Sequence, residues 1–359
     1  MFVKIAEFFK GRKVLVTGHT GFKGSWLCEI LRSFGAQVSG YSLAPNTEPN
    51  LFSILKIEEK VEGKIADVSN YKEFLTFVRK VKPEIIIHMA AQPLVRESYD
   101  DPLWTYQTNV MGTANVLQAI KETEFVKAAV IITTDKVYEN KERGEGYKEN
   151  DELGGYDPYS ASKACDEIVV KSYLRSFFNP EKFANVPLVA TARAGNVIGG
   201  GDWSKDRLIP DIVRFIEDEK AIVLRNPSAV RPWQHVLDPL YGYLLLAKGL
   251  YEGKKELVGA FNFAPGVGNF ITVEAIAKKG IESFSRGKIE IMPDESKHET
   301  GVLKLDASKA KEKLAWQARL GIEECLEWTF EWYKRHSAGE DMLNYTQGQI
   351  EKYFEMNGD

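Results

Sequence analysis

Short runs of apolar and β-branched residues alternate with amphipathic stretches along most of the chain. Such runs are typical of strands in a parallel sheet that is covered on both faces, and apolar residues at helical spacing between them predict connecting helices. The expected strands span residues 13–17, 36–41, 61–65, 83–88, 128–132 and 187–193. Strands that alternate with helices predict an α/β fold with a doubly wound, mostly parallel sheet of the Rossmann type.

The pattern changes after the sixth strand. Between residues 203 and 233, dispersed arginines, tryptophans and prolines suggest a loop-rich lid that grips a phosphorylated ligand. We therefore expect residues 1–192 to form the dinucleotide-binding domain, with about 232–264 returning to it. Residues 193–231 and 265–335 should form a smaller substrate-binding domain. The polar stretch 336–359 is expected to be a peripheral tail.

Several further helices follow from apolar residues at a spacing of three and four. They are expected over residues 26–34, 103–121, from Pro158 onward, 237–250, 273–284, 306–314 and 322–333. The long helix over 103–121 contains Asn109. A proline at the first position of a helix is favourable, which places Tyr159 and Lys163 near the start of the one that follows Pro158.

Composition narrows the class of protein. The chain has 359 residues, 44% of them hydrophobic, and a formal net charge of -4, which argues against a general binder of nucleic acid or of membrane surfaces. The three cysteines are scattered without metal-ligand spacing, so reduced thiols, a cytoplasmic location and no metal are expected. No export signal is evident, and no apolar segment approaches the roughly 20 residues needed to cross a bilayer.

A glycine-rich turn follows the first strand at once. Gly18, Gly21 and Gly24 are spaced three apart, and an amphipathic helix begins within the turn. Glycines let the backbone approach a pyrophosphate, and a helix N-terminus supplies N–H groups and a favourable dipole. The turn therefore predicts a dinucleotide site. The second strand ends in Tyr41-Ser42-Leu43, without the acidic residue usual for NAD and without an arginine for a 2′-phosphate.

The fifth strand ends in polar side chains that suit proton chemistry. Thr134, Asp135 and Lys136 follow residues 128–132 directly, and Tyr159 and Lys163 lie four residues apart on the next helix. Ligands bind at the carboxyl ends of strands in open α/β sheets. A tyrosine with a pKa of about 10 is a poor base at neutral pH, and a nearby lysine with a positively charged nicotinamide would favour its phenolate. Thr134 can bind the same substrate hydroxyl.

With these motifs in place, the chain from Gly18 to about Tyr333 resembles the extended short-chain dehydrogenase/reductases. Asp-Lys directly after the threonine resembles the nucleotide-sugar 4,6-dehydratases. The stretches 17–27 and 231–236 are most similar to the branch that acts on CDP-glucose. The resemblance implies NAD as cofactor, oxidation at sugar carbon 4, loss of water across carbons 5 and 6, and hydride return to carbon 6. It also implies a homodimer or higher homo-oligomer and a role in deoxysugar synthesis for surface polysaccharide such as O-antigen.

The resemblance also transfers site residues. It implies catalytic roles for Thr134, Asp135, Lys136, Tyr159 and Lys163, and places the nucleotide-sugar substrate against Asn196, Arg207 and Arg231. The residues that it places along the cofactor are Gly18, His19, Thr20, Gly21, Phe22, Gly24, Asp67, Val68, Ala90, Ala91, Gln92, Asn109, Tyr159 and Lys163.

Some roles remain open from sequence. Asp135 suits the general acid for the departing oxygen if burial raises its pKa, and it could instead be an ion-paired neighbour of Lys136. Lys136 stands where most relatives have glutamate, so it is either a neutral base at carbon 5 or a cation that stabilises the enolate. His19 either crowds the cofactor or points to solvent. Asp67 either reaches the adenine or caps the following helix, and both can hold.

Two other functions compete with dehydration. A nucleotide-sugar 4-epimerase would share the fold, the tyrosine and lysine pair and the transient oxidation, but it needs no acid/base pair for carbons 5 and 6. A non-catalytic NAD-binding module would not need Thr134, Tyr159 and Lys163 together. Asp135 and Lys136 therefore favour the dehydratase.

Overall fold

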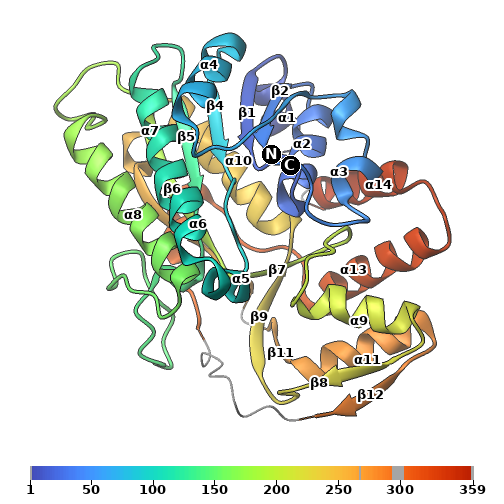
Figure 1. Cartoon of the computed structure of the whole chain (residues 1–359). Helices are drawn as coiled ribbons and strands as arrows, with labels where there is room; N and C mark the ends of the chain where they lie inside the picture. The colour runs from blue at the N-terminus through green and yellow to red at the C-terminus, as the bar shows by residue number, and fades with distance from the viewer. Residues whose placement is uncertain (1, 267, 293–302, 357–359) are drawn as a thin grey trace.

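The computed structural model describes residues 2–266, 268–292 and 303–356. A single parallel sheet of seven strands runs through the larger part of the molecule, with helices on both faces (Figure 1). Its order is β10-β6-β5-β4-β1-β2-β3. The strands are β1 (Lys13–Thr17), β2 (Gln37–Ser42), β3 (Glu62–Ile65), β4 (Ile85–His88), β5 (Ala128–Ile132), β6 (Leu188–Ala194) and β10 (Gly259–Phe263). The predicted doubly wound fold is confirmed.

Alternate side chains of the central strands enter two separate cores. Ile85 and Ile87 of β4 face the core that α2 (Phe22–Ser33) and α10 (Leu237–Tyr251) cover, together with α1 (Phe2–Phe9). Ile86 faces the opposite core, which α4 (Tyr71–Val81), α7 (Gly112–Lys121) and α8 (Pro158–Ser176) cover. Since every second residue of a strand points to the same side, a run of apolar residues serves both cores. This burial fixes the strand ends that carry the site.

The segment between residues 203 and 233 is not the loop-rich lid that its prolines suggested. It contains α9 (Leu208–Glu217), β8 (Ala221–Leu224) and β9 (Val230–His235). Ile209, Ile212 and Ile216 bury one face of α9, and Pro210 lies in the first helical turn, where no N–H is needed. The prolines and arginines outweighed this helical spacing in the sequence-based prediction.

The smaller part of the molecule lies at the carboxyl side of the main sheet, below it in Figure 1. It contains a three-stranded sheet, β11-β9-β7, and the pair β12-β8. Other elements, from both parts of the molecule, are α3 (Leu51–Ile54), η1 (Ile57–Glu59), α5 (Val95–Asp100), η3 (Asp135–Val137), β7 (Asn196–Ile198), η4 (Lys255–Leu257), β11 (Phe270–Thr272), α11 (Val273–Phe284), β12 (Lys288–Ile291), α12 (Ser308–Leu314) and α13 (Ile322–Ser337).

The helix predicted over residues 103–121 is divided by a π-helical turn. It consists of α6 (Pro102–Tyr106), the π turn η2 (Gln107–Met111) and α7. Insertions of this kind are frequent at functional sites, and here the turn carries Asn109, whose amide bonds the loop after β4. Hydrophobic periodicity does not show the insertion, because the helix axis continues.

Residues 336–356 are not a peripheral tail, and residues 357–359 of the predicted tail lie outside the described residues. Within the described stretch, α14 (Met342–Glu355) buries Ile350, Tyr353 and Phe354 in the core that also contains α2, and the Tyr353 hydroxyl donates to Asp238 at 2.8 Å. These apolar residues have the helical spacing i, i+3 and i+4. The sequence analysis missed the spacing because the residues between them are polar. None of the helices in the described ranges is long and apolar enough to span a bilayer.

Candidate active site

The glycine-rich turn joins β1 to α2 at the carboxyl edge of the sheet. Gly18 has φ +73°, and a side chain there would approach the Ala90 nitrogen to 2.7 Å. A side chain at Gly24 would lie 2.0 Å from the Gly18 carbonyl oxygen. Both positions therefore require glycine: one for the turn that rests on the loop after β4, the other for the helix that packs onto the turn.

The first turn of α2 has the properties of a pyrophosphate site. Its N-cap is Gly21, no side chain caps it and it contains no acidic residue, so its N–H groups and dipole favour an anion. The Thr20 hydroxyl bonds the Ser42 hydroxyl at 2.9 Å and the Leu43 carbonyl at 2.8 Å, which ties the turn to the end of β2. These residues fit a dinucleotide.

The small residues after β4 lie on the same side of the turn. Ala90 and Ala91 are half-buried. Gln92 and Asn109 are instead enclosed: the Asn109 amide accepts from the Gln92 nitrogen at 2.8 Å and donates to the Ser162 hydroxyl at 2.8 Å. Asn109 thus links the loop after β4 to the helix that carries the tyrosine. Its own amide atoms bond protein groups, so it supports the cofactor wall through Gln92.

Asp67 and Val68 follow β3, where the adenine end of a dinucleotide would lie. The Asp67 carboxylate accepts from the Ser69 nitrogen at 2.8 Å, but the N-cap of α4 is Asn70. The prediction that Asp67 caps that helix is therefore wrong, because an equally good cap stands three residues closer to it. Val68 is buried against Gly112 of α7.

His19 does not point to solvent. Its ring is 1% exposed and lies against Phe52, with 5.4 Å between ring centroids, and a side chain at Gly40 would collide with it. Burial lowers the pKa of His19 to about 4, although a backbone contact with Tyr41 opposes the shift. The imidazole is neutral at pH 7, and its effect on the cofactor remains a prediction.

Thr134 and Asp135 lie at the carboxyl end of β5 in a narrow space. The Thr134 hydroxyl donates to Asp135 Oδ1 at 2.9 Å, and a side chain at Gly195 would lie 2.9 Å from Asp135 Oδ2. Burial raises the pKa of the Asp135 carboxyl, and the nearby Lys136 ammonium offsets only part of the rise. A carboxyl that retains its proton longer than usual suits a general acid. Lys136 itself is half-buried.

Tyr159 begins the helix beside this pair. Burial raises the pKa of its phenol to about 12, the Thr134 hydroxyl opposes the rise, and the Asp135 charge adds to it. The phenol needs a cation beside it before it can act as a base near neutral pH. Lys163, one turn further along α8, is 3% exposed, and its ammonium donates to Asp166 at 2.6 Å.

The residues assigned to the nucleotide sugar belong to the first elements of the smaller part: Asn196 to β7, Arg207 to the start of α9 and Arg231 to β9. Asn196 of β7 pairs with Trp233 of β9, two residues after Arg231, so Asn196 and Arg231 are on one face of that sheet. Arg207 forms an ion pair with Asp202 at 2.8 Å. The charge of Arg207 also opposes the rise in the pKa of Tyr159, so the two side chains lie close together although they come from different parts of the molecule.

Lys23 also lies among the candidate site residues, although the sequence motifs did not indicate it. Burial lowers its pKa to about 8, the cations Arg207 and Lys163 lower it further, and Asp135 and Asp202 oppose the shift. Lys23 therefore lies among the residues assigned to both halves of the site. Its position inside the glycine-rich turn was the available signal, since that place is adjacent to phosphate.

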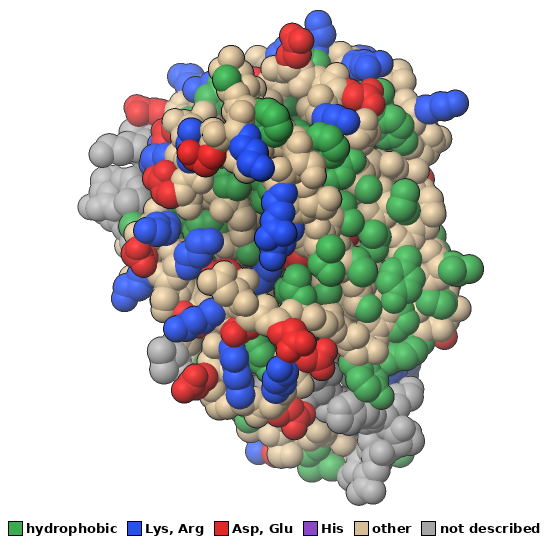
Figure 2. Space-filling model, turned by 90° about the vertical axis from the view of Figure 1, so that its left-hand side faces the viewer, with side chains coloured by type: hydrophobic (Ala, Val, Ile, Leu, Met, Phe, Trp, Pro, Cys, Tyr) green, Lys and Arg blue, Asp and Glu red, His purple; other side chains and the backbone are tan. Residues whose placement is uncertain are grey.

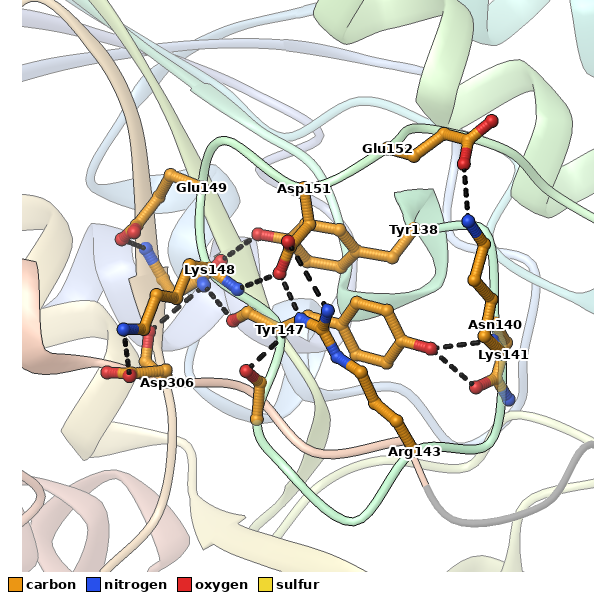
Figure 3. Close-up of polar contacts among 12 residues, drawn as sticks. Tyr138, Asn140, Lys141, Arg143, Tyr147, Lys148, Glu149, Asp151, Glu152 and Asp306 are labelled. Carbon is orange, nitrogen blue, oxygen red and sulfur yellow. Dashed lines mark hydrogen bonds and ion pairs between the residues drawn. The ribbon is translucent and has the colours of Figure 1, made fainter.

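The loop after η3 borders the site and is held by its own polar contacts (Figure 3). The Tyr147 ring stacks on Tyr138 with centroids 5.1 Å apart, Arg143 and Asp151 form an ion pair, and the Tyr147 backbone bonds Asp306 at 2.9 Å. These contacts connect the segment after Lys136 with the stretch that leads into α12.

A buried ion pair lies next to the candidate catalytic residues. Glu167 of α8 accepts two hydrogen bonds of 2.9 Å from Arg193 of β6, one of 2.6 Å from Thr133 and one of 2.7 Å from Thr191. Arg193 also donates to the Tyr138 hydroxyl at 2.6 Å. Burial alone would raise the pKa of Glu167, but Arg193 and the two hydroxyls hold it below the usual value. This network joins β5, β6 and α8.

We predict that Glu167→Gln lowers the free energy of unfolding by about 3–5 kcal/mol at pH 7, because Arg193 would remain buried without its counter-charge. The urea midpoint at constant slope measures the change. Since the pKa of Glu167 is lowered on folding, its stabilisation exists above the ordinary carboxyl pKa and is lost as pH falls through the lowered value. Glu152→Gln, in an exposed pair, should change little. Equal midpoints for the two variants would contradict the prediction.

Comparisons with known proteins place the chain. Residues 15–329 match the family model described as GDP-mannose 4,6 dehydratase. A CDP-glucose 4,6-dehydratase of Salmonella typhimurium is 46% identical over 97% of this chain and 97% of its own. A dTDP-glucose 4,6-dehydratase of Escherichia coli is 27% identical over 89% and 93%.

Solved structures agree on the fold. The dTDP-glucose 4,6-dehydratase of Streptomyces venezuelae, solved with NAD bound, has a TM-score of 0.77 at 22% identity and covers 92% of this chain and 99% of its own. A UDP-glucose-4-epimerase of Stenotrophomonas maltophila, also with NAD, has a TM-score of 0.77 at 21% identity over 92% and 100%. From the family model and the Salmonella relative together, the chain belongs to the nucleotide-sugar dehydratase family described as GDP-mannose 4,6 dehydratase.

Proposed function

We propose that the chain is an NAD-dependent CDP-glucose 4,6-dehydratase, which converts CDP-glucose to CDP-4-keto-6-deoxyglucose. The observation that carries this proposal is the identity of 46% over 97% of the chain to a CDP-glucose 4,6-dehydratase. The buried Asp135 beside Thr134 and Tyr159 supplies the chemistry that this reaction needs.

The oxidation half of the reaction uses Thr134, Tyr159 and Lys163. Thr134 orients the hydroxyl on sugar carbon 4, and Tyr159 removes its proton. Lys163 supplies the positive charge that a buried phenol requires to act as a base. The glycine-rich turn at Gly18, Gly21 and Gly24 would hold NAD, which would supply the hydride acceptor for the oxidation at carbon 4 and the hydride donor for carbon 6.

The elimination half uses Asp135 and Lys136. A ketone at carbon 4 makes the proton on carbon 5 acidic, and the oxygen on carbon 6 then needs a proton to leave as water. Asp135 supplies that proton, which its raised pKa favours. Lys136 is the next residue of η3, and we assign it to the carbon 5 proton, whose loss either a neutral amine or an ammonium would promote.

The diphosphate end of the substrate needs cations. Arg207 and Arg231 supply guanidinium groups, which bind phosphate oxygens in pairs, and Asn196 adds an amide. Lys23, within the glycine-rich turn, is close enough to Arg207 for the charge of Arg207 to lower its pKa. The recognition of cytosine rests on similarity to the Salmonella relative.

A 4-epimerase is the second candidate, and it is less supported. A UDP-glucose 4-epimerase of Mycoplasma genitalium is only 23% identical over 88% of the chain. Epimerisation also has no use for a buried acid at Asp135, because no oxygen leaves the sugar.

A panel of CDP-, UDP-, dTDP- and GDP-glucose tests the function. Mass spectrometry of the products should show the loss of one water from CDP-glucose, and turnover of the other sugars should be at least about tenfold slower. Tyr159→Phe, which preserves the ring and removes only the hydroxyl, should abolish this product. A product of unchanged mass would favour the epimerase, and preference for another nucleotide would contradict the cytidine assignment.

We also propose that the chain forms a homodimer through the outer face of α5, α6, η2 and α8. Leu103 is 81% exposed and Ile168 57%, and Tyr99 and Met111 are also exposed. Figure 2 shows the side of the molecule that carries α8, with hydrophobic side chains gathered over one half of it. A patch of this kind on a water-facing surface is typical of a protein interface.

Leu103→Arg should weaken this dimer, because a charge would replace an apolar contact at the centre of the patch. Sedimentation velocity at several protein concentrations should show a monomer for the variant where the unchanged chain sediments as a dimer. Met356→Arg is the matched control, since Met356 is also exposed but lies at the end of α14 on the opposite side of the sheet. Equal sedimentation of all three proteins would rule out this interface.

A further inference from the structure

A chain of buried polar groups begins beside the glycine-rich turn. Thr17, the last residue of β1, accepts hydrogen bonds from the Met89 and Ala90 nitrogens, each at 3.1 Å. With both lone pairs of its oxygen occupied, the hydroxyl donates its own proton to His88 Nδ1 at 2.7 Å. The direction of this bond therefore follows from the two bonds that Thr17 accepts.

His88 determines the direction of the next hydrogen bond in this chain of groups. Burial lowers its pKa to about 3, and the nearby Lys163 charge adds to the effect, so the ring is neutral at pH 7. Since Nδ1 is the acceptor, Nε2 carries the hydrogen and donates to the Thr113 hydroxyl at 3.2 Å. The proton of Thr113 is then free to point at another acceptor.

Asp166 is the acceptor at the end of this chain. It is fully buried, and its Oδ2 accepts from the Lys163 ammonium at 2.6 Å. Burial raises the pKa of Asp166 to about 6, while Lys163 and the Thr113 hydroxyl oppose the rise. Among the described residues, Asp166 Oδ1 is buried without a hydrogen-bond partner. The Thr113 hydroxyl lies near enough to lower the pKa of this carboxyl, so it is the donor available to Oδ1.

We propose that Asp166 is a positioning residue for Lys163, supported by Thr113, His88 and Thr17 from behind. An ammonium has three donors, and Asp166 engages one of them on the protein side. The other two donors remain for the cofactor, and the positive charge of the ammonium acts on the Tyr159 phenol. Asp166 also supplies the buried counter-charge that an enclosed ammonium needs in order to keep its place.

The same chain connects the lysine with the cofactor turn. Thr17 precedes Gly18 directly, and the nitrogens that it binds belong to the loop on which Gly18 rests. The charged or titratable groups around the pair include Cys165 and Glu167 on α8, His88 on β4 and Lys23 on α2. Glu167 is already neutralised by Arg193, and His88 is neutral, so Asp166 is the counter-ion that Lys163 uses.

The inference rests on the proposed role of Tyr159 as a base, but its test needs no sugar substrate. Tyrosine labelled with carbon-13 reports the ionisation of Tyr159 by NMR in the enzyme saturated with NAD, and the Tyr159→Phe variant assigns the signal. Asp166→Asn keeps the shape and removes the charge. We expect the titration midpoint of Tyr159 to rise by about one pH unit or more, because the cation beside it is no longer held.

Two further variants complete the experiment. Thr113→Val removes the supporting hydroxyl and keeps the ion pair, so it should raise the midpoint in the same direction by a smaller amount. Cys165→Ala, on the same helix next to Asp166, should leave it unchanged. If Asp166→Asn does not fold, Thr113→Val alone decides.

An unchanged midpoint in Asp166→Asn, or in Thr113→Val where it alone decides, would overturn the proposal. A lowered midpoint would overturn it as well, since it would show that Asp166 acts on Tyr159 only as a negative charge. If the acid limb of turnover with CDP-glucose shifts in parallel, the positioning role extends to catalysis. Absence of turnover in the unmodified chain would remove the proposed function and leave the NMR result intact.

Discussion

The buried ion pair between Glu167 and Arg193 is the constraint on which the site depends. Together with the hydroxyls of Thr133 and Thr191, it joins the ends of β5 and β6 to α8. Separate burial of either charge would cost several kcal/mol, so the two must stay together. Thr134 follows Thr133 directly, and Lys163 lies one turn before Glu167. The pair therefore holds the two halves of the catalytic group at a fixed separation.

Within this frame, two chemical tasks fall to different residues. Tyr159 is too deeply buried to act as a base without a cation, and Lys163 is held by a carboxylate of its own. Among the described residues, Asp135 has no ion pair of this kind, so burial raises its pKa although Lys136 and Thr134 oppose the rise. One environment favours a charged group and the other a protonated one. In the proposed mechanism, this contrast separates oxidation at carbon 4 from elimination across carbons 5 and 6.

Sequence alone predicted the parallel sheet, because its strands are short apolar runs and its glycine-rich turn needs particular spacing. It also predicted that Thr134 and Tyr159 come together. It did not show the network behind them, because Glu167 and Arg193 are ordinary charges until the fold makes them neighbours. The same holds for Asp166. The sequence analysis did not predict the helix α14, because its buried residues are few and are separated by polar ones.

The division of labour can be tested in a single turnover with CDP-glucose and the Asp135→Asn variant. The near-ultraviolet absorbance of reduced nicotinamide reports oxidation, and mass spectrometry reports dehydration. We expect the variant to accumulate the reduced cofactor and to release no dehydrated sugar, since Tyr159 and Lys163 remain intact while the acid at carbon 6 is missing. Loss of both signals would show that Asp135 also serves the oxidation. Normal dehydration would show that it serves neither step, and either result would contradict the account.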